Sequence, residues 1–174
     1  LDSGAGNYEQ MWMTTSLRGM VSGTLRVDVL DEGVHSGDAS GVVPSSFRLA
    51  RTILDRLENS TTGEILPDSF QVDIPQQRKD QALQAAKSLG DELYKKFPFT
   101  GSMEPSLKSH QELIFNRTWR AALSVTGAEG LPPISSAGNV LRPCTELKLS
   151  LRLPPTVDAR DAADKLKNLL ESDS

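Results

Sequence analysis

The sequence contains few of the residues that build a self-contained catalytic or metal site. Its 174 residues include one cysteine, Cys144, and two histidines, His35 and His110. One cysteine excludes an intramolecular disulfide, and two histidines are too few for a zinc site that needs several imidazoles. The sequence also lacks a nucleophile elbow, a phosphate-binding glycine loop and a dinucleotide fingerprint. We therefore do not expect this chain to catalyse a reaction alone.

Long apolar runs and an excess of positive charge are also missing. No apolar stretch approaches the roughly 20 residues that cross a bilayer, and the first residues, Leu1-Asp2-Ser3-Gly4, do not resemble a signal peptide. The formal net charge of −4 provides no attraction for nucleic acid or for an anionic membrane. We expect neither as a partner, and the lone cysteine favours a reducing, cytoplasmic compartment.

With 37% hydrophobic and 24% charged residues, the composition is that of one ordinary globular domain. The chain does not begin with methionine and opens into a small, polar, glycine-rich segment. This start suggests a piece cut from a longer polypeptide at a domain boundary. A site assembled from two domains would be incomplete in such a piece.

Alternation of apolar and polar residues predicts three strands, each with one buried face. The predicted strands cover residues 23–30, 119–126 and 145–153. The pattern is clearest in the last strand, where leucines occupy every second position: Leu147, Leu149, Leu151 and Leu153.

Apolar residues at helical spacing predict helices over residues 44–59 and 75–97 and a further helix after Pro154-Pro155. Pro44 is suited to the first position of its helix, and Thr156 can cap the last one. Residues 60–116 are interpreted as a helical insertion.

The order strand, helix, insertion, strand, strand, helix predicts an α+β fold of the ferredoxin-like, split βαβ type. Helices would cover one face of an antiparallel sheet and leave the other face partly in water. This fold has one more strand, which we expect beyond Ser174.

Four residues are candidates for chemistry. His35, in a glycine-rich loop, could donate a hydrogen bond to a carbonyl or an oxyanion. Arg152, on the polar face of the leucine strand, could bind a carboxylate with two hydrogen bonds. Asn139 could line a pocket and Asp2 could ligate a metal. Each also has an ordinary alternative as a solvated surface residue, so none is specific in isolation.

Four motifs, in order and at matching spacing, carry a resemblance to a family. They are SLRGM at 16–20, GVHSG at 33–37, GAEG at 127–130 and LSLRLP at 149–154. Together they resemble the lid domain of carnosinase and cytosolic non-specific dipeptidase, in the aminoacylase and glutamate-carboxypeptidase superfamily. The resemblance covers nearly the whole chain. Ser40-Gly41 departs from the paired glycines usual in carnosinases, so the preferred dipeptide stays open.

The resemblance implies a lid inserted into the catalytic domain of a zinc-dependent dipeptidase. Two lids pair into a homodimer, and each sends a histidine, here His35, to the oxyanion in the partner's active site. Arg152 would bind the terminal carboxylate of a small peptide substrate, and Asn139 would touch the substrate across the dimer. Residues 17–174 would form this lid, with its helical insertion at about 60–116.

Residues 1–16 would be a tail of the catalytic domain, in which Asp2 completes the coordination of one metal. By the same resemblance, the full-length enzyme uses two zinc ions, with manganese or cobalt as alternatives. The remaining ligands would lie outside this sequence, and the isolated piece would bind no metal and be inactive.

Two other hypotheses are compatible with the residues. One is a free-standing ferredoxin-like module that binds a small molecule or regulates a partner, because this fold hosts many functions. The other is a scaffold that only holds dimers together.

Overall fold

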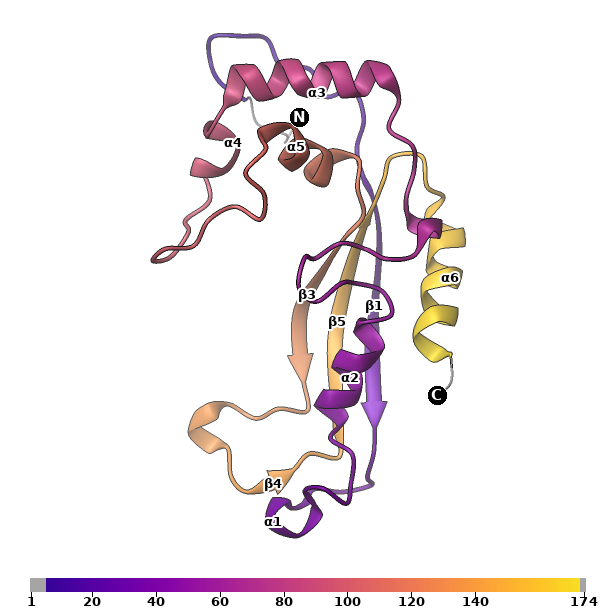
Figure 1. The fold of residues 1–174 in the computed structure, drawn as a ribbon. Helices are drawn as coiled ribbons and strands as arrows, with labels where there is room; N and C mark the ends of the chain where they lie inside the picture. Colours follow the sequence, from indigo (N-terminus) through magenta and orange to yellow (C-terminus); the bar gives the residue numbers. More distant parts are fainter. Residues whose placement is uncertain (1–5, 173–174) are drawn as a thin grey trace.

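The computed structural model describes residues 6–172. Its elements, in chain order, are β1 (Gly19–Asp28), β2 (Val34–His35), α1 (Ser36–Ala39), α2 (Ser46–Leu54), η1 (Asp68–Phe70), α3 (Gln76–Leu89), α4 (Glu92–Lys95), α5 (His110–Thr118), β3 (Ala122–Glu129), η2 (Ile134–Ser136), β4 (Val140–Leu141), β5 (Cys144–Leu153) and α6 (Ala159–Glu171). Figure 1 shows a long, narrow sheet with α3, α4 and α5 at one end and α1 and β4 at the other.

Strand β5 is the centre of the main sheet, between β1 and β3, and it is antiparallel to both. Of these three strands, the last in the sequence therefore lies between the first and the second, as a split βαβ fold requires. The predicted α+β class is confirmed. The remaining strand, expected beyond Ser174, would lie beside β1 in this topology and stays a prediction.

The predicted alternation in β5 is also confirmed. Its four leucines are 0–5% exposed, whereas Lys148 and Arg152 on the opposite face are exposed. The leucines join two buried clusters: Leu151 and Leu153 pack with residues that include Phe70 and α6, and Leu147 and Leu149 pack with Val27 and α2. The leucine face of β5 is thus buried, and the side chains of Lys148 and Arg152 on its other face are in contact with water.

The predicted helix starts at Pro44 and Thr156 are each wrong by two residues. Ser45 is the N-cap of α2, and its hydroxyl accepts the N–H of Arg48 at 3.3 Å. Asp158 caps α6 and accepts the N–H groups of Arg160 and Asp161, both at 2.9 Å. In each case a side-chain oxygen satisfies N–H groups that have no partner within the helix.

Other boundaries also differ from prediction: the strand predicted over 23–30 is β1, at Gly19–Asp28, and the helix predicted over 44–59 ends at Leu54. The helix predicted over 75–97 breaks at Gly90, whose φ of +48° separates α3 from α4. The strand predicted over 119–126 begins later, because Trp119 and Arg120 still donate to Phe115 at the end of α5. It continues through a bulge after Val125 to Glu129, beyond the predicted end at residue 126.

Gly130 provides a test of this end of β3. Its φ is +85°, and a Cβ there would overlap the carbonyl oxygen of Cys144. Gly130→Ala should lower the free energy of unfolding by about 1–2 kcal/mol, because alanine disfavours the left-handed backbone. Overpacking against Cys144 should lower it by roughly 1–3 kcal/mol more. Gly101→Ala, at φ +58° with no atom within 4 Å of the new Cβ, should lose only the first part. Urea denaturation measures both free energies of unfolding, and equal losses would contradict the packing argument.

Candidate functional site

A two-stranded ribbon brings two of the predicted site residues together. In the pairing of β2 with β4, His35 lies opposite Val140, and the N–H of Ser36 donates to the carbonyl oxygen of Asn139 at 2.9 Å. His35 and Asn139 therefore share one exposed end of the molecule, beyond the ends of β1 and β5 (Figure 1). Their backbones are linked, while the amide side chain of Asn139 makes no hydrogen bond within residues 6–172.

Backbone contacts hold this ribbon against the end of the main sheet. The N–H groups of Val29 and Leu30 both donate to the carbonyl oxygen of Pro143, at 2.8 and 3.3 Å. A Cβ on Gly33 would lie 2.8 Å from Cγ1 of Val140, so the two segments can approach only because residue 33 has no side chain.

The imidazole of His35 is oriented by the chain that follows it. Nδ1 accepts the N–H of Gly37 at 3.1 Å, and the ring thereby caps α1. In the neutral imidazole, a ring nitrogen that accepts a hydrogen bond leaves the proton on the other nitrogen. Nε2–H of His35 is therefore the donor available to a ligand.

Arg152 lies near the opposite end of the sheet. It pairs with Met20 on β1 and with Ala122 on β3, whereas β5 begins at Cys144 beside the ribbon. Eight residue steps separate Cys144 from Arg152, which at about 3.3 Å per step is about 26 Å. The structure thus joins His35 with Asn139 but does not bring Arg152 to them.

Two further arginines contribute charge at this end of the sheet: Arg18, which interacts with Arg152, and Arg117, which interacts with Arg18. Partial burial, followed by the charges of Arg152 and Arg117, lowers the pKa of Arg18. Burial and the charge of Arg117 also lower the pKa of Lys96. No carboxylate within residues 6–172 forms an ion pair with any of the three arginines. Their mutual repulsion would be relieved by an anion, so this end of the sheet suits a carboxylate ligand.

Sequence reasoning missed Arg18 as a neighbour of Arg152 and Arg117 as a neighbour of Arg18. Arg18 lies two residues before Met20, so it is on the same face as Arg152 once the register of β1 and β5 is known. Arg117 reaches this area from the end of α5. No local pattern in the sequence carries either relationship.

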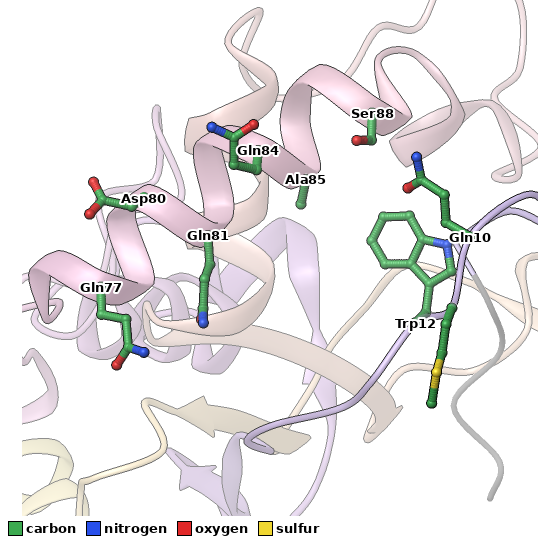
Figure 2. Close-up of a pocket in the computed structure, with 9 residues that line it drawn as sticks. Gln10, Trp12, Gln77, Asp80, Gln81, Gln84, Ala85 and Ser88 are labelled. Carbon is green, nitrogen blue, oxygen red and sulfur yellow. The ribbon is translucent and has the colours of Figure 1, made fainter.

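The pocket between residues 10–12 and α3 does not contain the predicted site (Figure 2). Most of its lining from α3 is uncharged: Gln77, Gln81, Gln84, Ala85 and Ser88. Asp80 is its only ionisable lining residue, and Oδ1 of Asp80 already accepts a hydrogen bond from Gln76 at 2.9 Å. Trp12 faces α3 across this pocket, and none of the three described candidates lines it.

Asp2 lies outside the described residues. Among residues 6–172 no group of three or more histidine, cysteine, aspartate or glutamate side chains could hold a metal ion, so the described residues do not fit a metal site. The same part of the chain contains no helix that is long and apolar enough to span a bilayer.

The three described candidates are therefore exposed side chains at the two ends of an α+β domain. The family model described as peptidase dimerisation domain matches residues 15–174. The chain belongs to this family, the dimerisation domain of the M20 peptidases. No curated protein matches the chain by sequence.

Solved structures show the same fold, each with a TM-score of 0.67. The di-peptidase Dug1p from Saccharomyces cerevisiae is 23% identical, and the match covers 90% of this chain and 32% of that one. Human carnosine dipeptidase 1 is 18% identical, with 94% and 35% covered. The M20 family metallo-carboxypeptidase Sso-CP2 from Sulfolobus solfataricus is 17% identical, with 90% and 40% covered. The chain thus spans about a third of the length of these enzymes.

Gly37 tests the orientation of His35. A Cβ at Gly37 would lie 2.7 Å from Cε1 and 3.0 Å from Nδ1 of the ring, so Gly37→Ala should displace the imidazole and break its hydrogen bond. Ring ¹⁵N shifts should show His35 mainly with its proton on Nε2 in the native chain and as a tautomer mixture in the variant. Gly138→Ala, with no atom within 4 Å, is the control. Unchanged tautomers in Gly37→Ala would disprove this orientation.

Proposed function

We propose that this chain is the lid of a homodimeric, metal-dependent dipeptidase and supplies substrate contacts to two active sites. His35 and Asn139 serve the active site of the partner subunit, and Arg152 serves the site of its own subunit. Membership of the peptidase dimerisation family supports the dimer, and the two dipeptidases of the same fold support the substrate class.

The proposal rests on the distance between His35 and Arg152 within one chain. A fully extended dipeptide spans at most about 7 Å, whereas Cys144 and Arg152 are about 26 Å apart along β5. His35 lies beyond Cys144, in the ribbon outside the sheet (Figure 1). One dipeptide can therefore contact both His35 and Arg152 only if they come from different subunits.

His35 acts as a hydrogen-bond donor in this scheme. Its Nε2–H points to the carbonyl oxygen of the scissile bond, which becomes negative when water adds to the carbonyl carbon. A donor fixed before the reaction stabilises that charge more in the transition state than in the substrate. The bond from Gly37 N–H to Nδ1 provides this fixing. The amide of Asn139, free for a ligand, binds a polar group of the same substrate.

Arg152 recognises the free carboxylate at the end of the dipeptide. A guanidinium can donate two parallel hydrogen bonds to a carboxylate. The side chain is exposed, and the neighbouring charge of Arg18 adds to its attraction for an anion. This recognition restricts the enzyme to substrates that end near the scissile bond.

The metal belongs to the catalytic domain in this proposal. The described residues do not fit a metal site, so we propose two zinc ions held by residues outside them, with Asp2 as one ligand and residues 1–16 as a tail of that domain. Bound metal would polarise the carbonyl and activate water. A cytoplasmic location is supported by the free thiol of Cys144.

His35→Ala in the full-length enzyme tests the donor. Loss of one oxyanion donor should lower kcat by roughly 10²–10³-fold, about 2.7–4 kcal/mol, with little change in KM. His110→Ala is the matched control, because His110 pairs with Asp91 at 3.1 Å in the helical insertion, away from the ribbon. Steady-state hydrolysis of a dipeptide measures both variants. An unchanged kcat in His35→Ala would favour a domain that only holds dimers together.

Mixed dimers test whether the contacts cross between subunits. A dimer of one His35→Ala subunit and one Arg152→Ala subunit has one intact site only if His35 acts across the interface, so it should regain about half of the native activity. Both homodimers should be nearly inactive. The two variants are co-expressed with different affinity tags, and the mixed dimer is isolated and assayed. An inactive mixed dimer would place His35 and Arg152 in the same site of one chain.

A further inference from the structure

The guanidinium of Arg18 bonds two separate carbonyl groups. It is half-buried, and its Nη1 donates to the carbonyl oxygen of Asn116 at 3.0 Å and to that of Arg120 at 3.4 Å. Asn116 is in the last turn of α5, where carbonyl groups lack partners within the helix. One side chain therefore ties the start of β1 to the end of α5 and the segment that leads into β3.

This link is made at the level where the sheet itself stops. The last pair between β1 and β5 joins Gly19 to Leu153, and Pro154 has no N–H with which to continue the ladder. Beyond that pair β5 no longer provides backbone groups between the segment before β1 and the segment before β3. These two segments therefore cannot both bond to a strand between them. The side chain of Arg18 makes the connection instead.

Arg152 is next to this link, one residue before the last pair of the sheet. Its two neighbours across the sheet are Met20 and Ala122, and Arg18 and Arg120 come two residues before each of them. Because side chains at every second position of an extended chain share a face, the position of Arg18 lies beside that of Arg152, whereas Arg120 is in the segment that leads from α5 into β3. The link thus fixes the backbone on both sides of Arg152.

The charge of Arg18 acts on Arg152 as well. The two guanidinium groups are close enough for the charge of Arg152 to disfavour the charged form of Arg18. Arg18 is held by two carbonyls, whereas the exposed Arg152 has no hydrogen bond or ion pair within residues 6–172. Repulsion therefore acts on the Arg152 side chain, which is free to turn away from the sheet end.

We propose that Arg18 is a positioning residue for substrate carboxylate recognition. It holds the two segments beside Arg152 in place and keeps the Arg152 guanidinium directed away from the sheet, toward the carboxylate. In this proposal Arg18 acts through Arg152, and its Nη1 is committed to the carbonyl oxygens of Asn116 and Arg120. This inference rests on the proposed role of Arg152.

The test compares a dipeptide with its C-terminal amide, which lacks the carboxylate, as substrates of the full-length enzyme. The preference is the kcat/KM for the dipeptide divided by the kcat/KM for its amide. Arg18→Met should lower the preference on the order of 10- to 100-fold, because a displacement of about 1 Å of a binding group can cost about 10²-fold. The loss should appear mainly in the KM of the dipeptide. Arg26→Met, on the same strand but paired with Asp28 and Glu146 at its other end, should leave the preference unchanged.

Arg18→Lys keeps the positive charge and a donor, so it should restore part of the preference. It also decides the matter if Arg18→Met fails to fold: a folded Arg18→Lys with an undiminished preference overturns the inference. Equal losses on both substrates would make Arg18 a merely structural residue and overturn it too. Arg152→Ala separates the two hypotheses. If that variant keeps the preference, the proposed role of Arg152 fails; if only Arg18→Met keeps it, Arg18 alone is excluded.

Discussion

Strand β5 lies between β1 and β3, and the leucines on its buried face hold it in register. Burying one leucine contributes about 1.5–3 kcal/mol, and four alternate along this strand at 0–5% exposure. A shift of one residue would turn the leucines into water and Arg152 into the core. The register therefore fixes which face carries Arg152 and how far it lies from the ribbon that carries His35. The positions of His35 and Arg152 therefore depend on the packing of these leucines, although neither residue is part of the buried core.

A rigid strand of this length has a consequence for the whole enzyme. Since a small substrate cannot reach both ends of one sheet, an enzyme that uses both ends needs two copies of the domain. Association then completes the active site as well as stabilising the protein. In the proposed enzyme, dimerisation and substrate binding would therefore be combined in one domain that spans about a third of the length of its structural relatives.

Much of the fold could be predicted from local patterns, and much of the site could not. The alternation around Leu149 identified β5, its buried face and the exposure of Arg152 because a strand repeats every two residues. The start of α2 was misplaced because Ser45 could cap a helix as well as Pro44 could begin one. The pairing of His35 with Val140 has no local signal, since two residues are too short to show a period. The roles assigned to these residues came from family resemblance.

The two ends of the domain are built differently, and this difference suits their roles. The arginine end is packed over buried residues such as Leu153 and is tied across the sheet by Arg18. The ribbon at the other end depends on a few backbone hydrogen bonds and on close contacts at Gly33 and Gly37. Segments with little buried surface open at low free energy. The orientation of His35 therefore depends on local contacts, chiefly the bond from the N–H of Gly37 to Nδ1, rather than on a buried core.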